Sequence, residues 1–124
     1  MNVALIHLGL VLVAQALPLS VSDLLANPDR FDGQPVTVTG TISDFRGNPF
    51  RRRGPKYTFD LSDGTGTILV VVYGMPPPCE SGAVTVEGTF EQRKRRVETS
   101  DSYYNFKIVT LNVICLPERE PKTK

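Results

Sequence analysis

Residue types that often carry chemistry are scarce in this chain of 124 residues. It has no tryptophan, two cysteines, and one histidine, His7. His7 lies in the first ten residues, and a domain from which this segment is cleaved has no imidazole. The absence of an imidazole excludes Ser-His-Asp and Cys-His catalytic arrangements. Two lone cysteines with no histidine nearby also do not make a zinc site. We therefore expect a protein that is not an enzyme and that holds no metal and no cofactor.

The chain also lacks a hydrophobic run of the roughly 20 residues that a transmembrane helix needs. Its apolar run, Val3 to Ala14, is shorter and ends in Ala14-Gln15-Ala16. This layout predicts a signal peptide over residues 1–16, although its first residues carry no Lys or Arg. The alternative is a leading strand or helix packed on the domain. We expect export to the periplasm or outside the cell; the alternative is a cytoplasmic protein.

Cys79 and Cys115 are 36 positions apart in a small domain. Two cysteines in an exported domain of this size usually pair, so we expect a Cys79–Cys115 disulfide. The alternative is two free thiols in a reducing compartment.

Apolar alternation and turn residues predict an all-β chain. Ser20 or Ser22 can cap a short helix that ends before Pro28, and Asp32-Gly33 predicts a turn. Gly40 predicts a sharp bend or bulge in the first strand. In the last strand the apolar residues change register, from Phe106 and Ile108 to Val109, Leu111, Val113 and Cys115, which predicts a bulge there. The segment Asp63-Gly64-Thr65-Gly66 predicts a tight hairpin turn. The expected strands are Val36 to Phe45, Tyr57 to Ser62, Thr67 to Tyr73, Val84 to Glu91 and Tyr104 to Cys115.

The length of the chain indicates one domain. We expect a lead-in with the short helix over residues 17–32, a five-stranded barrel over 33–116 and a flexible tail over 117–124. A closed barrel suits strands of this number and spacing because it leaves no open sheet edge.

Positive charge is concentrated although the formal net charge is only +1. Nine of the 14 Lys and Arg residues fall in two short stretches, which places like charges close together. Such clustering indicates a surface that meets an anionic partner; the alternative is solvated hairpin tips. The two stretches contain Arg46, Arg51, Arg52, Arg53 and Lys56, and then Arg93, Lys94, Arg95 and Arg96.

The segment Tyr57-Thr-Phe-Asp-Leu-Ser-Asp-Gly-Thr-Gly-Thr-Ile-Leu-Val-Val-Val-Tyr73 resembles a hairpin of OB-fold domains, particularly the anticodon-binding type. Segments 33–41 and 82–90 resemble the first and fourth strands of that family. Exported bacterial single-domain OB-fold proteins are similar in outline. The resemblance covers about residues 33–115 and implies a five-stranded Greek-key OB-fold barrel with a short N-terminal helix.

The resemblance also implies a ligand face between two loops, over 46–56 and 92–103, where such domains take oligonucleotides or oligosaccharides. The basic stretches fall in these loops. Phe50, Tyr57, Tyr73, Tyr103 and Tyr104 are the aromatic candidates nearby, of which Tyr57, Tyr73 and Tyr103 join the predicted site. Thr58 stands where the family usually has an outward aromatic, and Asp60 would repel phosphate.

We therefore expect a non-catalytic binding module whose partner is an anionic polymer, either single-stranded nucleic acid or an acidic envelope component. The alternative is a structural or protein-interaction module of the cell envelope. The haem-carrying relatives use a histidine near the end of the barrel, and this chain has none there.

Overall fold

The structure is a computed structural model that describes residues 17–93 and 106–117. The expected signal peptide, residues 94–105 and nearly all of the expected tail lie outside these ranges. The elements, in chain order, are β1 (Leu17–Pro18), α1 (Val21–Ala26), α2 (Pro28–Phe31), β2 (Pro35–Asn48), β3 (Lys56–Ser62), β4 (Thr67–Tyr73), β5 (Gly82–Gln92) and β6 (Phe106–Cys115).

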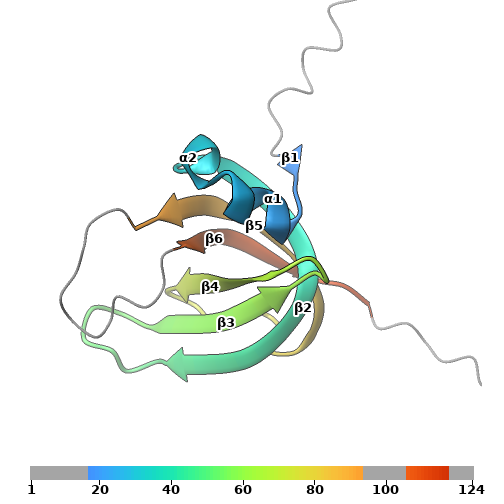
Figure 1. Ribbon diagram of the computed structural model, residues 1–124. Coiled ribbons are helices and arrows are strands. Elements are labelled where there is room, and N and C mark those ends of the chain that lie inside the picture. The colour runs from blue at the N-terminus through green and yellow to red at the C-terminus, as the bar shows by residue number, and fades with distance from the viewer. Residues whose placement is uncertain (1–16, 94–105, 118–124) are drawn as a thin grey trace, which may run out of the picture.

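Five of these strands, β2 to β6, form a closed barrel (Figure 1). The strand order is β1-β2-β3-β4-β6-β5, and a further pairing between β2 and β5 closes the sheet. The neighbours within the barrel are antiparallel except β4 and β6, which run parallel. The predicted barrel is confirmed, and β4 has the predicted bounds. The two-residue β1, which pairs in parallel with β2, was not predicted.

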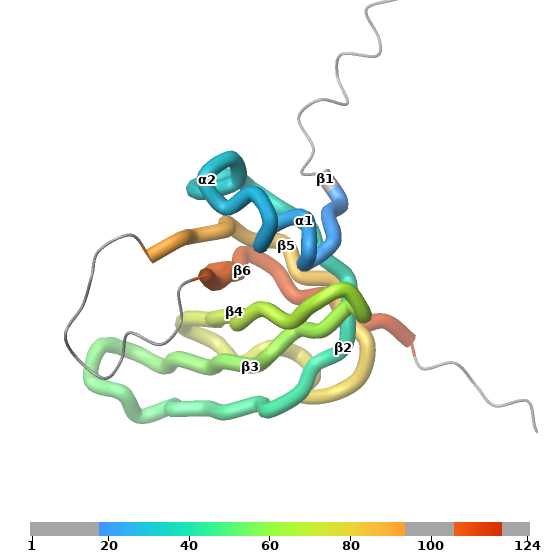
Figure 2. The backbone as a smooth tube through the Cα atoms, in the orientation of Figure 1, coloured from blue at the N-terminus to red at the C-terminus, as the bar shows by residue number. Residues whose placement is uncertain are grey.

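The long strand β2 belongs to both halves of the barrel, and Figure 2 shows it curving around the wall. Its first part, Pro35 to Ile42, pairs with β5, and its second part, from Thr41 to Asn48, pairs with β3. Gly40 lies just before this change of partner. A Cβ atom there would be 2.5 Å from the Ser62 carbonyl oxygen, so only glycine lets the two backbones approach so closely.

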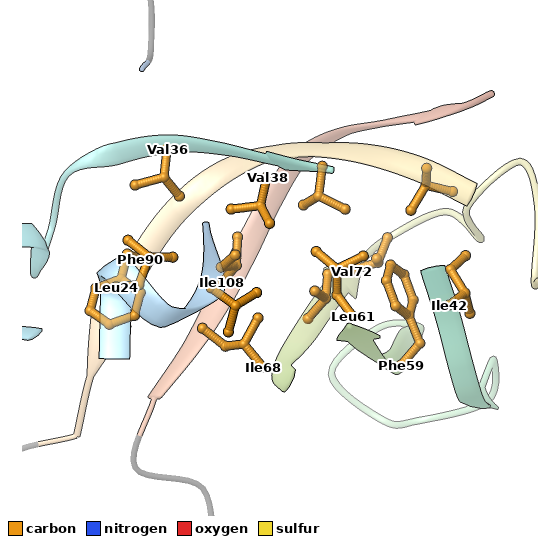
Figure 3. Packing of buried hydrophobic residues seen from close by; sticks show 14 of the residues in the cluster. Leu24, Val36, Val38, Ile42, Phe59, Leu61, Ile68, Val72, Phe90 and Ile108 are labelled. Atoms are coloured by element: carbon orange, nitrogen blue, oxygen red, sulfur yellow. The ribbon is translucent and has the colours of Figure 1, made fainter. Parts of the chain in front are cut away.

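The barrel interior is filled by aliphatic and phenylalanine side chains that alternate along the strands (Figure 3). On β3, Tyr57, Phe59 and Leu61 are buried and their neighbours are only half-buried. The middle of β4 is buried on both faces, since Val71 is 2% exposed although it points away from the row of Val70 and Val72, whereas the end residues Thr67 and Tyr73 are exposed.

The register of β6 shifts at Leu111, which confirms the predicted bulge. Glu87 pairs with Asn112 and Gly88 pairs with Thr110, so Leu111 has no partner on β5. Sequence alternation placed Leu111 with the apolar row of Val113 and Cys115, and this placement was wrong. The bulge turns Leu111 outward, where it is 77% exposed.

The predicted short helix is α1, and its cap is Ser20 rather than Ser22. The Ser20 hydroxyl accepts from the Asp23 amide at 3.1 Å, and the Asp23 carboxylate accepts from the Ser20 amide at 3.2 Å. Pro28 stops α1, as predicted, and opens the four-residue α2, which was not predicted. The two helices lie together at one end of the barrel, where α1 contacts β4 and α2 contacts β5 (Figure 1).

The predicted tight hairpin over Asp63 to Gly66 also holds α1 in place. One Asp63 carboxylate oxygen accepts from the Val21 amide at 2.9 Å, and the other accepts from the Thr65 hydroxyl at 2.6 Å. The Thr65 hydroxyl in turn accepts from the Ser22 amide at 3.0 Å. Amides at the start of α1, which have no partner inside the helix, therefore find acceptors in the hairpin.

The predicted disulfide is present between Cys79 and Cys115, with a Cα–Cα distance of 6.3 Å. It joins the connection between β4 and β5 to the end of β6. Both cysteines are partly buried against the core.

Candidate ligand-binding face

The loop between β2 and β3 covers residues 49–55 and projects beyond the end of β4 (Figure 2). The expected loop, 46–56, was too long: Arg46 lies on β2 and Lys56 on β3, so only Arg51, Arg52 and Arg53 of the first basic stretch lie in the loop. No acidic residue occurs between Asp44 and Asp60. Phe50 is 93% exposed, and Arg52 and Arg53 are exposed beside it. Neither arginine forms an ion pair with any residue that the structure describes. The loop therefore presents two guanidinium groups and one aromatic ring to solvent.

Arg51 packs against the barrel, whereas the neighbouring Arg52 and Arg53 point into solvent. Its Nε donates to the Gly54 carbonyl at 3.0 Å, and its guanidinium lies 5.7 Å from the centre of the Tyr73 ring. The Gly74 amide donates to the Pro55 carbonyl at 3.0 Å, which ties the loop to the end of β4. Arg51 stabilises the loop conformation by a cation–π contact and covers part of Tyr73.

The wall beside this loop is built from cross-strand rows of outward residues. One row is Asn48, Lys56 and Tyr73, and it combines a cation with an aromatic ring that is 49% exposed. The next row is Arg46, Thr58 and Val71, of which Val71 is buried, and the row after it is Ser43, Asp60 and Leu69.

Carboxylates weaken the positive character of this wall. Asp44 has a positive φ of 53° at a shift in the β2–β3 register, and its carboxylate lies 3.3 Å from the Arg46 guanidinium. Burial raises the pKa of Asp60 above its ordinary value; the Asp44 charge adds to this rise and Arg46 opposes it. Arg46 is therefore already paired with an anion, and Asp60 is a second negative group in the same region.

The second basic stretch begins where β5 ends. The Gln92 amide donates to the Asp32 carboxylate at 3.0 Å, and its side chain donates to Asp29 at 2.9 Å. Arg93 follows and is exposed. Lys94, Arg95, Arg96 and Tyr103 lie outside the described residues, as does Tyr104. That the two basic stretches share one face stays a prediction.

Tyr57 is placed in the core rather than on the predicted ligand face. It is 8% exposed, and its ring stacks on Phe45 with centroids 6.2 Å apart. We therefore do not carry it into the proposed site. Phe50 replaces it as the accessible aromatic of this loop. The alternation of Tyr57 with Phe59 and Leu61 is the sequence signal that indicates its inward direction.

The described residues do not build a metal site. Over 17–93 and 106–117, no group of three or more His, Cys, Asp or Glu side chains is arranged to hold a metal ion. The helices described in these ranges do not have the length and hydropathy that crossing a bilayer requires.

Solved structures similar to this barrel identify its fold. A structure of yeast Stn1 and Ten1 has a TM-score of 0.61 at 11% identity, over 85% of this chain and 65% of that one. A protein described as a putative aspartyl-tRNA synthetase from Leishmania major Friedlin has a TM-score of 0.59 at 16% identity, over 89% of this chain and 22% of that one. The chain has an OB fold.

Two further OB-fold neighbours show different bound partners. RecG, solved with a three-way DNA junction, has a TM-score of 0.55 at 20% identity, over 82% of this chain and 12% of that one. An OBody solved with hen egg-white lysozyme has a TM-score of 0.50 at 16% identity, over 73% of this chain and 88% of that one. Identities this low establish the fold alone. No family model and no curated protein matches the sequence.

The synthetase and the Stn1–Ten1 chain are both longer than this chain, which limits what their functions imply for it. The chain spans only 22% of the synthetase and 65% of the Stn1–Ten1 chain. The activities of those whole proteins therefore do not follow from the shared barrel.

Proposed function

We propose that this OB-fold domain is a non-catalytic binding module whose two basic loops bind an anionic ligand. The observation that carries the proposal is the β2–β3 loop, in which Arg52 and Arg53 are exposed without an acidic partner among the described residues and Phe50 is 93% exposed. Guanidinium groups bind phosphate or carboxylate groups with charge-assisted hydrogen bonds, and an exposed ring adds apolar contact. Arg93 and the basic residues that follow it would extend the positive surface.

Single-stranded nucleic acid is the first ligand to test. RecG is solved with DNA, and an aspartyl-tRNA synthetase shares the fold, which supports this choice by analogy. Single-strand binding commonly combines backbone neutralisation with base stacking. Arg52 and Arg53 would neutralise phosphates, and Phe50 or the exposed part of Tyr73 would stack on bases.

A protein-interaction module is the alternative, and exposed aliphatic side chains on β6 favour it. Leu111 is 77% exposed and Ile114 is 40% exposed, on a strand segment that carries no charge. The OBody bound to lysozyme supports the idea that a barrel of this fold can serve as a protein-binding scaffold. In this alternative the basic loops are solvated hairpin tips.

Fluorescence anisotropy with labelled single-stranded DNA and RNA at several salt concentrations tests the proposal. We expect binding that weakens as salt rises, because counterions released from phosphates drive it. The double variant Arg52→Gln with Arg53→Gln should reduce the slope of log affinity against log salt by about 0.7 for each lost contact. Arg30→Gln, which removes an exposed cation of α2, is the matched control and should leave the slope unchanged.

Two outcomes contradict the proposal. If DNA, RNA and other polyanions all fail to bind at low salt, the anionic-ligand function is wrong. If they bind but Arg30→Gln weakens binding as much as the Arg52→Gln, Arg53→Gln double variant does, the loop is not the site. Binding of a protein partner that survives the loop variants and is lost in Ile114→Lys would instead support the protein-interaction alternative.

The disulfide supports an oxidising compartment and thus export of the domain. An exported domain meets acidic polysaccharides and lipid headgroups more often than nucleic acid. Export therefore favours an envelope component over nucleic acid as the anionic ligand of the β2–β3 loop.

A further inference from the structure

We propose that the β2–β3 loop docks the domain on the surface of a lipid bilayer that carries anionic headgroups. This inference rests on the proposed function, because it names the anionic partner of the same loop. The loop would contact the surface of the bilayer and would not cross it.

The first argument is the pairing of exposed apolar groups with cations at this end of the barrel. Phe50 is 93% exposed between Pro49 and Arg51, and Met75 is 73% exposed just beyond β4. Tyr73, which pairs with Lys56, is 49% exposed. Large apolar side chains in water that are gathered beside cations indicate an interaction site. An aromatic ring that enters the headgroup region while arginines meet lipid phosphates is a known mode of interfacial binding.

The second argument is the shape of the loop. It projects beyond the end of β4, and the Gly74 amide and the Arg51 contact with Tyr73 fix its base (Figure 2). A loop with a fixed base can place Phe50 against a flat surface at little further cost in conformational entropy. A flat bilayer would contact only the tip of the loop, so binding would not require the neighbouring wall of the barrel.

The third argument separates a bilayer from a nucleic-acid strand. A bound strand has to run along a continuous positive groove. Here Asp60 lies on the wall next to the loop, and Arg46 is paired with Asp44 at 3.3 Å. These carboxylates would face a strand that followed the wall, whereas a bilayer touching the tip would avoid them. The stretch from Phe45 to Phe59 has no acidic residue, so the tip itself is uniformly basic.

The absence of tryptophan allows a direct experiment. Phe50→Trp places the only indole of the chain at the loop tip, and its emission should shift to shorter wavelength with phosphatidylcholine–phosphatidylglycerol vesicles. Pure phosphatidylcholine vesicles should cause little shift. Ile114→Trp is the matched control, since Ile114 is also exposed and apolar but lies on β6 opposite Thr85, which pairs on its other side with Thr39 in the first part of β2. Its emission should not move.

Co-sedimentation of the otherwise unchanged chain with the same vesicles provides the second measurement. Phe50→Ser should weaken partition onto anionic vesicles about ten-fold by removing apolar contact. Arg52→Gln and Arg53→Gln should each weaken it about five-fold, the effect of one basic residue at an anionic surface. These side chains are exposed, so the variants should fold as the unchanged chain does.

The outcomes distinguish the bilayer from other anionic ligands. If the emission of the Phe50→Trp variant does not move with anionic vesicles at low salt, the inference is overturned. If single-stranded DNA changes this emission and vesicles do not, nucleic acid is the ligand and the proposed function stands. If neither vesicles nor any polyanion binds, the proposed function fails as well. Vesicle binding that is insensitive to Phe50→Ser and to the arginine variants would also overturn the role of this loop.

Discussion

At the scale of single residues, Asp60 places a carboxylate on the wall beside the basic loop and so opposes an anionic ligand. Burial raises its pKa, the Asp44 charge raises it further, and Arg46 lowers it in part. The three charges lie where β2 and β3 shift register. An anionic ligand that followed this wall would meet the combined charge of two carboxylates and one guanidinium.

We predict that Asp60→Asn binds polyanions about three-fold more tightly at neutral pH, because one like charge near the ligand is removed.

The pKa of folded Asp60 is raised, so the protein loses stability as the pH rises from 3.8 through the folded value. Asp60→Asn should therefore unfold at slightly higher urea than the unchanged protein at pH 7 but not below pH 3.8.

Glu87→Gln is the control for this charge change. Glu87 accepts from the Asn112 side chain at 3.3 Å on β5 and β6, away from the basic loop. If both variants raise the affinity equally, the effect reflects net charge rather than the place of Asp60.

At the scale of elements, the β3–β4 hairpin acts as the docking partner of α1. Burial alone would raise the pKa of Asp63, but hydrogen bonds from Thr65 and from the Val21 amide lower it below its ordinary value. The same carboxylate thus accepts hydrogen bonds from the Thr65 amide in the turn and from the Val21 amide at the start of the helix.

We predict that Asp63→Ala loses about 2 kcal/mol of unfolding free energy at pH 7, because hydrogen bonds to a charged acceptor disappear. The pKa of folded Asp63 is lowered, so its stabilisation is complete above pH 3.8 and is lost as the pH falls through the folded value. Urea unfolding should therefore show a difference between the two proteins that shrinks in acid. A difference that stays constant with pH would contradict the role of the carboxylate charge.

The strands could be predicted from sequence because their alternation is regular. β3 and β4 have the predicted bounds within one residue, since each is flanked by turn residues. The four-residue α2 and the two-residue β1 were missed because elements so short leave no periodic pattern. Leu111 was misplaced because alternation indicates that a bulge exists but not which residue is extra.

The site was less predictable than the fold. The clustering of arginines marks the β2–β3 loop from sequence alone. The contact of Arg51 with Tyr73 and the pairing of Arg46 with Asp44 depend on a loop conformation and a register shift that spacing does not encode. The sequence therefore indicates where the cations are but not which of them are available.

At the scale of the whole molecule, the disulfide forms a covalent loop that contains a large part of the barrel. It encloses β5, the second basic stretch and β6 in a loop of 36 positions. Cross-linking such a loop restricts the unfolded chain far more than the folded one.

We predict that the double variant Cys79→Ala with Cys115→Ala loses about 3–4 kcal/mol of unfolding free energy. Urea unfolding of the variant and of the unchanged protein, with and without reductant, measures this loss. Reductant should destabilise only the unchanged protein. Mass spectrometry after alkylation without reduction should find no labelled cysteine, and two labelled cysteines would contradict the bridge.

The shared strand β2 has a consequence for hydrogen exchange. Thr41 and Ile42 have partners on both sides, Ser62 and Leu61 on β3 and Ala83 and Gly82 on β5. Neither neighbour can separate from this point without opening the barrel. The amide protons here should therefore be among the last to exchange with solvent deuterium, and their rates report the opening of the entire molecule rather than the breathing of one edge.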